Sequence, residues 1–417
     1  MLQQRWLRIV PVALVMYTIS YVDRTNIALA LDPRISSLMH DLAMDDELKG
    51  QAAGIFFLGY ALFQMAGGYL ARNWSAKKLV SLCLIFWGTC AVGCGLARTF
   101  FQFEAARFLL GVSESSVFPA TVVLLAHWFP SAERARANAF WNLCQPLAVV
   151  ASAPVTGWLL HKYDWHTMLI IEGALPFVWL PIWWFFIADH PREAGWISPE
   201  EKNHLETTLL VEAAQLEPPK KISFWQQLLT PTILLMIVIN FIHNSQAYGC
   251  MTFFMEGLKA RNFDPVQYGF LFAVPYAVTA VIMVLNSWHS DKTRERRGHV
   301  ALVYTLSGAS LVLSVLTRDH FWLSYAFMCL AIPGPYAALA PFWAIPTETM
   351  PRAVFGPVIG LVNALGNTGG YFGPWIVGWL AKEYGSINIP FAALGICMLL
   401  AAGLAFLLPR GKMTNDG

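Results

Sequence analysis

The sequence predicts an all-α membrane protein with twelve transmembrane helices in two six-helix halves. Hydrophobic residues make up 56% of the 417 residues and charged residues only 13%, whereas a soluble domain is roughly 25% charged. A hydrocarbon core of about 30 Å takes roughly 20 apolar residues per helix, and about twelve stretches qualify. They lie near 9–31, 49–71, 79–97, 100–127, 136–160, 168–188, 230–256, 265–289, 299–317, 320–346, 354–381 and 387–409.

The charges in the loops predict the orientation. The first stretch is too long and too polar at its centre for a cleaved signal peptide, so we expect it to remain in the protein. If both termini are cytoplasmic, most Lys and Arg residues fall in cytoplasmic loops, as the positive-inside rule requires. The first external loop then carries acids instead: Asp41, Asp45, Asp46 and Glu47.

One long polar segment divides the chain. We predict an N-terminal half at 1–188, a cytoplasmic linker at 189–223 and a C-terminal half at 224–417. Ser198 followed by Pro and two acids is a typical helix start, which predicts a short surface helix near 199–214. Transporters built from two such repeats bind substrate between them near mid-membrane.

Asp23 and Arg24 are the most informative residues, because they lie at the centre of the first apolar stretch. A charge there costs on the order of 3 kcal/mol on insertion scales, so two adjacent charges indicate partners, a wet cavity or a function. Tyr17, Tyr21 and Arg24 share one helix face, and Asp23 is turned about 100° away from it.

The fourth stretch repeats this pattern, with Arg107, Gly111 and Glu114 on one face. Glu114 and the acid of the first stretch can hold protons or neutralise the two arginines. The functional interpretation is that the arginines bind an anion and the acids carry protons. The structural alternative is a set of static salt bridges between helices.

Further polar residues lie inside predicted helices. Any single one could simply bond a neighbouring helix, but so many amides favour a polar solute. Three acids near helix ends, Glu172, Glu256 and Glu348, are expected to reach water or a loop and to have structural or gating roles. The polar positions are Tyr60, Gln64, Asn142, Gln145, Asn240, His243, Asn244, Gln246, Tyr248, Asn363 and Asn367.

Cofactors, metals and nucleic acid are not expected as partners. Cys90 and Cys94 share a helix face, but two thiols without further ligands make a poor zinc site. All seven cysteines fall in apolar stretches, where Cys acts as small apolar filler. The net charge of +2 is spread over short loops, which gives no basic surface for nucleic acid.

Several segments together resemble the anion:cation symporter family of the major facilitator superfamily, and the resemblance runs nearly end to end. It is closest to bacterial permeases for tartrate, sugar acids and hydroxyphenylacetate. The segments are Tyr21-Val-Asp-Arg-Thr-Asn-Ile27, Gly111-Val-Ser-Glu-Ser-Ser-Val-Phe-Pro119, the central loop from Asp189 to Glu201, Pro341-Phe-Trp343, and Gly366-Asn-Thr-Gly-Gly370 with Gly373-Pro374.

The resemblance implies proton-coupled import of an organic anion by alternating access, in the bacterial inner membrane and as a monomer. It implies that Asp23 and Glu114 are protonation sites and that Arg24 and Arg107 engage the substrate carboxylate. The residues expected to line the substrate site are Tyr21, Arg24, Tyr60, Gln64, Arg107, Gln145, Asn240, Asn244, Tyr248, Asn363 and Asn367.

The loop after the second stretch departs from the family pattern. The superfamily usually has an acid where this chain has Arg72, and a glycine where it has Ser75. That acid commonly caps a helix and pairs across the cytoplasmic gate, so the gate of the N-terminal half must work differently. The residues expected to act in gating are Lys77, Asp291 and Arg294.

Alternatives remain for the substrate and for the coupling. Trp141, Phe253, Phe342 and Trp343 could stack on an aromatic carboxylate, and an uncoupled facilitator or exchanger of organic anions would need no proton site. A non-transporting receptor on this fold should carry a long tail, which the sequence lacks. A membrane enzyme is disfavoured because the loops show no nucleophile-base or metal-ligand spacing.

Overall fold

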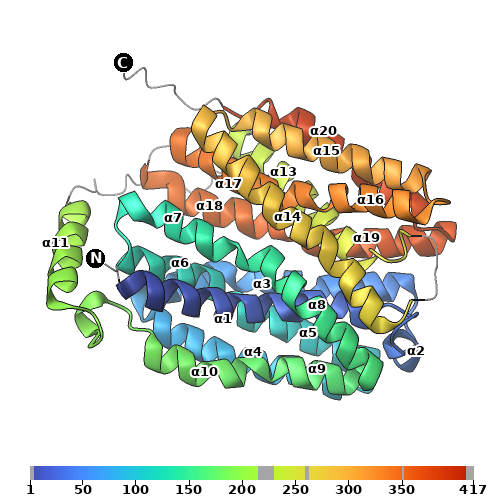
Figure 1. Cartoon of the computed structure of the whole chain (residues 1–417), viewed down its shortest axis with the longest axis horizontal. Coiled ribbons are helices and arrows are strands. Elements are labelled where there is room, and N and C mark those ends of the chain that lie inside the picture. The colour runs from blue at the N-terminus through green and yellow to red at the C-terminus, as the bar shows by residue number, and fades with distance from the viewer. Residues whose placement is uncertain (1–3, 215–229, 259–262, 350–351, 410–417) are drawn as a thin grey trace.

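The computed structural model is a long bundle of helices and describes residues 4–214, 230–258, 263–349 and 352–409. No strand occurs in these ranges. In Figure 1 the N-terminal helices, blue to green, form the lower part of the bundle. We call them the N-terminal group: α1 (Gln4–Ala30), α2 (Leu38–Asp41), α3 (Asp46–Asn73), α4 (Ala76–Leu96), α5 (Phe100–Glu114), α6 (Val117–Trp128), α7 (Ser131–Asn142), α8 (Cys144–Lys162), α9 (Trp165–Gly173) and α10 (Leu175–Phe186).

The C-terminal helices, yellow to red, form the upper part, and we call them the C-terminal group (Figure 1). Between the groups lie a short 3₁₀ helix, η1 (Pro191–Glu193), and α11 (Pro199–Ala214), which forms where the sequence predicted a surface helix. The C-terminal group consists of α13 (Pro231–Thr252), α14 (Pro265–Thr293), α15 (Arg297–Leu316), α16 (Phe321–Ala331), α17 (Pro333–Thr349), α18 (Arg352–Asn367), α19 (Gly369–Tyr384) and α20 (Asn388–Ala405).

The predicted membrane architecture is confirmed. Within the described ranges, eleven helical segments are long and apolar enough to cross a membrane. The eleventh predicted stretch, 354–381, contains no single helix of that length because α18 and α19 meet at Thr368. The two short helices together occupy that position.

Several predicted spans are interrupted, which the sequence analysis did not anticipate. The fourth and fifth spans break between α5 and α6 and between α7 and α8, and the tenth breaks between α16 and α17. A proline cannot donate to the carbonyl four residues before it, and each of these breaks has a proline at that distance. The three prolines are Pro119, Pro146 and Pro335, four residues after Ser115, Asn142 and Ala331.

The bundle has two distinct ends. One end carries α2, and we call it the α2 end; the other carries α11, the start of α1 and the end of α20, and we call it the α11 end (Figure 1). At the α11 end the buried Arg5 bonds Glu133 of α7 at 2.8 Å and Glu201 of α11 at 2.7 Å. Thus α11 is attached to the N-terminal group.

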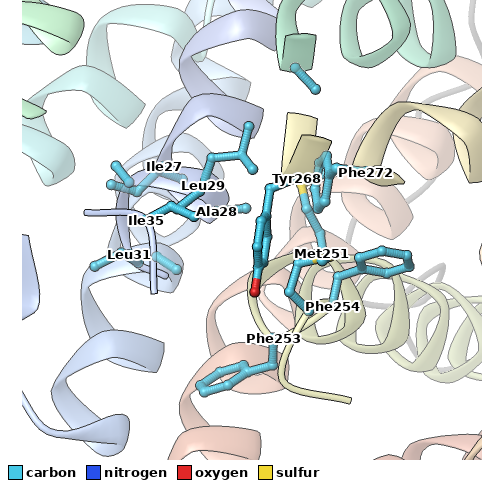
Figure 2. Close-up of a cluster of buried hydrophobic side chains, with 14 of the residues drawn as sticks. Ile27, Ala28, Leu29, Leu31, Ile35, Met251, Phe253, Phe254, Tyr268 and Phe272 are labelled. Atoms are coloured by element: carbon cyan, nitrogen blue, oxygen red, sulfur yellow. The ribbon is translucent and has the colours of Figure 1, made fainter. Parts of the chain in front are cut away.

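The hydrophobic cores differ between the two ends. Toward the α11 end, each group has a core of its own. At the α2 end one core is shared: Figure 2 shows Ile27 and Leu31 of the α1 region beside Phe253 and Tyr268 of the C-terminal group. The two groups are therefore joined by apolar packing at the α2 end.

Glycines let the two groups approach closely there. A Cβ at Gly50 of α3 would lie 2.1 Å from the carbonyl oxygen of Pro374 in α19, and one at Gly157 of α8 would lie 2.3 Å from that of Pro265 in α14. Either Cβ would force the backbones apart, since real Cβ contacts are not this short. The helix pairs α3/α19 and α8/α14 thus close this end of the bundle.

Candidate functional site

A buried ion pair between α1 and α5 forms the centre of the site. Arg24 donates through Nη2 to Oε2 of Glu114 at 2.9 Å, and the Ser20 hydroxyl donates to the same oxygen at 2.6 Å. Both charged side chains are at most 5% exposed. The helix spacing explains the arrangement, because Ser20 and Arg24 are four residues apart and share a face.

Aromatic rings surround the Arg24 guanidinium. Its central carbon lies 4.7 Å from the ring centroid of Tyr21, 4.8 Å from that of Tyr60 and 5.1 Å from that of Phe56. The negative faces of such rings attract a cation. These rings therefore help to hold the guanidinium in place beside its carboxylate partner.

Asp23 points away from this ion pair, as the helix geometry predicted. Its carboxylate accepts a hydrogen bond from the indole nitrogen of Trp87 in α4. Its backbone carbonyl accepts a bond from Nη1 of Arg107 at 2.9 Å. The adjacent charges of α1 thus face different neighbours, and Asp23 pairs by hydrogen bond with a neutral group.

Among the buried Lys and Arg side chains that the structure describes, Arg107 has the least charge compensation. In the part of the chain that the structure describes, it makes no ion pair within 4.0 Å, and its Nε has no hydrogen-bond partner. Only 3% of the residue is exposed. Its guanidinium lies 5.4 Å from the Phe56 ring that also contacts Arg24. Both cations therefore lie around the Phe56 ring of the N-terminal group, and we call this set of side chains the charged wall of the site.

Glu172 is placed differently from its prediction. It was expected to reach water or a loop, yet it is 3% exposed. Thr156 of α8 donates to one of its oxygens at 2.7 Å and Asn26 of α1 donates to the other at 2.9 Å. The helix end on which Glu172 lies is covered by α1 and α8, so this acid links three helices inside the N-terminal group.

The predicted amides fall into two sets. Gln64 accepts a bond from Asn367 at 3.4 Å, which brings two predicted substrate residues together across the two groups. The others bond within their own group: Gln145 bonds Asn142 at 3.2 Å, Asn240 bonds the carbonyl of Val362 at 3.2 Å, and Asn244 bonds the carbonyl of Asn240 at 2.8 Å. Asn363 is half-buried on α18.

Tyrosines of the C-terminal group face the charged wall. The Tyr248 ring packs against Phe57 of α3 with centroids 4.0 Å apart, and its hydroxyl lies within reach of Arg24 and Tyr21. Tyr336 of α17 is close enough to Tyr21 for an electrostatic interaction. The predicted His243 instead bonds the Tyr304 hydroxyl at 3.1 Å.

The three predicted gating residues do not meet in this structure. The Lys77 ammonium lies 4.9 Å from the ring centroid of Trp184. Asp291, in the last turn of α14, pairs with Arg296 just before α15 at 2.6 Å. Arg294 ends α14 in a left-handed conformation, with φ of 53°.

An acid from a distant part of the chain caps the helix that follows the loop after α3. Asp189, which follows α10, accepts hydrogen bonds from the Ser75 hydroxyl and from the backbone N–H of Lys77, the latter at 2.9 Å. Both donors lie at the start of α4, where a negative charge is favourable. Asp189 therefore caps α4 from a distant part of the sequence.

Polar contacts also join the two groups at the α2 end. Lys49 of α3 pairs with Glu256, and the lysine is only 1% exposed. Arg34 donates to the carbonyl of Met255 at 3.0 Å, and Lys382 of α19 pairs with Asp45 at 2.9 Å. All of these would have to break if the groups separated at this end.

Sequence reasoning missed several contacting residues. Ser20 could have been found from its spacing to Arg24, and Phe56 from its spacing to Tyr60, each four residues apart on one face. Nothing in the sequence indicates that Trp87 bonds Asp23, because that contact depends on how α1 and α4 pack. Tyr276 and Tyr336 likewise carry no local signal.

The fold and this site define a class of protein, a helical membrane transporter. Two helix groups joined at one end, with paired charges buried inside one of them, suit a carrier of small molecules. A family model described as "Major Facilitator Superfamily" matches residues 13–374. The chain belongs to the major facilitator superfamily.

Relatives with transporter names cover nearly the whole chain. A protein of Agrobacterium vitis bearing the name of a tartrate transporter is 28% identical over 97% of this chain and 90% of its own length. GudP of Bacillus subtilis, named for galactarate and D-glucarate transport, is 28% identical over 98% of this chain and 92% of its own. A quinolone resistance transporter of Acinetobacter baumannii is 26% identical over 96% of this chain and 93% of its own.

Solved structures share the fold. The inward-open conformation of the xylose transporter XylE from E. coli superimposes with a TM-score of 0.76 at 15% identity, over 98% of this chain and 97% of that one. An inward-facing bacterial homologue of the lysosomal transporter Spinster gives a TM-score of 0.74 at 18% identity, over 96% of each chain.

Proposed function

We propose that this transporter imports an organic carboxylate, a sugar acid or small hydroxy acid, by proton symport through alternating access. The observation that carries the proposal is the buried pair of Arg24 and Glu114 beside the less compensated Arg107. A buried cation whose acid partner can take a proton becomes free to bind an anion. The names of the tartrate and galactarate/D-glucarate relatives support a carboxylate.

The proposed cycle uses the residues of the charged wall. Protonation of Glu114 frees Arg24, Arg107 supplies a second attraction for the carboxylate, and Asp23 is the second proton site. After the proton and the anion leave, Glu114 pairs with Arg24 again. When the site is empty, Arg24 is paired with Glu114, and when proton and substrate are both bound, the substrate carboxylate neutralises Arg24. Neither state has an uncompensated buried charge. A site that holds only the proton or only the substrate does have one.

The two halves, 1–188 and 224–417, are proposed to move against each other with the linker at 189–223 attached to the first. With both termini cytoplasmic in the bacterial inner membrane, the α2 end is external. The shared core and the Lys49–Glu256 pair at that end then support an inward-facing state. Lys77, Asp291 and Arg294 would act when the α11 end closes.

The test is proton movement into proteoliposomes that contain a pH dye. Sugar acids, tartrate and aromatic acids are added to the wild-type protein, to Asp23→Asn and to the matched control Asp264→Asn, a loop position where Asn also caps a helix well. We expect internal acidification by a hydroxylated acid, retained by the control. Asp23→Asn should lose it yet keep counterflow of a labelled acid.

The outcomes separate this function from the other candidates. Acidification by Asp23→Asn equal to the wild type would overturn the proton role of Asp23. Counterflow without acidification by the wild type would mean uncoupled exchange. Preference for aromatic acids would favour the second candidate, an aromatic carboxylate permease, which the rings around Arg24 also suit.

A further inference from the structure

Charge is distributed unequally between the two sides of the proposed site. The six apolar stretches of the C-terminal half, from 230–256 to 387–409, contain no Lys or Arg at any position of their sequence. Their only acid is Glu256, at the end of the first stretch, and it pairs with Lys49. Any anion that enters the site therefore finds its cations on the N-terminal side.

The two cations lie close together on that side. The guanidinium groups of Arg24 and Arg107 lie 5.1 Å and 5.4 Å from the centroid of one ring, Phe56. Arg107 also bonds the backbone carbonyl of the residue before Arg24. This wall can hold one charged end of an extended molecule.

The opposite wall offers neutral hydroxyls. Tyr276 of α14 and Tyr336 of α17 have ring centroids 5.8 Å apart, and Tyr248 packs nearby against Phe57 of the N-terminal group. The Tyr276 hydroxyl is buried and lies within reach of the Tyr336 hydroxyl, but in the described part of the chain it forms no hydrogen bond of standard geometry. A phenol can both donate to and accept from a substrate hydroxyl.

A second carboxylate at this wall would be buried without a cation. The penalty for such a charge is several kcal/mol even after relaxation, whereas a substrate hydroxyl could form a well-aligned hydrogen bond with the Tyr276 phenol. Resting on the proposed function, we propose that the substrate has a single carboxylate at one end and an uncharged, hydroxylated chain at the other. An aldonate fits this description, and an aldarate of equal length does not.

The inference is tested with two six-carbon acids that share their hydroxyl configuration, galactonate and galactarate. Initial uptake of each is measured in proteoliposomes with the full-length protein at pH 7, where every carboxyl is ionised. We expect kcat/KM for galactarate to be at least tenfold lower. This would distinguish the chain from its relative named for galactarate transport.

The uptake measurements distinguish failure of the single-carboxylate inference from failure of the proposed carboxylate import. Galactarate uptake equal to or faster than galactonate uptake would overturn the single-carboxylate inference and leave carboxylate import standing. Uptake of neither acid, nor of any other hydroxylated carboxylate, would overturn both.

A tyrosine variant tests the neutral wall directly. Loss of one hydrogen bond, worth about 1 kcal/mol, should raise KM for galactonate roughly fivefold in Tyr276→Phe. The matched control is Tyr304→Phe, because that buried hydroxyl already bonds His243; its KM should not change. Equal KM values for the two variants would contradict the assigned role of Tyr276.

Discussion

The two helix groups bury different kinds of polar side chain: the N-terminal group buries charged residues and the C-terminal group buries neutral ones. The N-terminal group buries Asp23, Arg24, Arg107, Glu114 and Glu172, each at most 5% exposed. The C-terminal group buries neutral amides, hydroxyls and His243, most of which bond within the group. Charges need matched partners, because an unpaired buried charge costs far more than an unpaired amide. The comparison predicts that the first group tolerates substitution less well than the second.

The largest expected effect comes from breaking the central ion pair. Glu114→Ala leaves Arg24 buried without its carboxylate and should cost about 3–5 kcal/mol of unfolding free energy. The matched change in the neutral group, Asn244→Ala, should cost about 1 kcal/mol, the net value of a hydrogen bond. Denaturant titration in detergent measures both.

The double variant Arg24→Leu with Glu114→Leu sharpens this result. Removing both charges at once leaves no unpaired charge at this position, and only the Ser20 hydroxyl loses its acceptor, so most of the stability should return. The contrast between the two groups would fail if the double variant lost as much unfolding free energy as Glu114→Ala. It would also fail if Asn244→Ala lost as much unfolding free energy as Glu114→Ala.

The next effect concerns Glu172, the third acid of the charged group. Glu172→Ala removes the acceptor of Asn26 and Thr156 and should cost about 1–3 kcal/mol, because two buried donors lose their partner. Glu172→Gln keeps one oxygen and adds an amide that can bond the Thr156 hydroxyl, so its stability should be near that of the wild type. Thermal unfolding compares them, and equal losses in both variants would show that the negative charge itself is required.

A smaller effect tests where the two groups meet. Lys49→Met breaks the pair with Glu256 and should shift the equilibrium toward opening at the α2 end by on the order of tenfold, which corresponds to about 1.4 kcal/mol. The control is Lys382→Met, which breaks exposed pairs with Asp45 and Glu47 that contribute little because solvent screens them.

Electron spin-echo distances report this opening between labels at two exposed positions, His40 and Glu383. A longer-distance population in Lys49→Met, and much less of it in Lys382→Met, is the expected result. Unchanged distances in Lys49→Met would mean that apolar packing alone holds this end closed.

The smallest effect is a pH dependence at the α11 end. Burial raises the pKa of Glu133, but hydrogen bonds and charge from Arg5, with help from Trp6, outweigh it and hold the pKa below its ordinary value. Stability from this pair is therefore present above the ordinary glutamate pKa of about 4.3 and is lost as the pH falls through the lower, folded-state pKa. Melting temperatures measured against pH should fall less steeply at acid pH in Glu133→Gln than in the wild type, because the variant lacks the titrating carboxylate. A steeper fall in the variant would contradict this assignment.

The sequence predicted the membrane spans well, because about 20 apolar residues in a row have few other uses. It also separated Asp23 from Arg24 correctly, since adjacent residues on a helix face different directions. It left open which acid pairs with which arginine. That depends on the relative rotation of α1 and α5, and no local pattern encodes it.

Two kinds of feature could not be predicted from the sequence. The breaks within spans went unrecognised although Pro119, Pro146 and Pro335 were visible, because membrane helices often accommodate proline without a break. The cap that Asp189 supplies to α4 joins residues more than a hundred positions apart. Such a contact follows from tertiary packing and not from local preference.

The close glycine contacts between α3 and α19 have a consequence for the energy supply of the cell. Backbones that touch at Gly50 and Pro374 leave no width for a file of water molecules. A membrane that stores energy as an ion gradient loses it through any continuous water path. A larger residue at Gly50 should therefore make the membrane leaky to protons, in addition to any effect on the carrier itself.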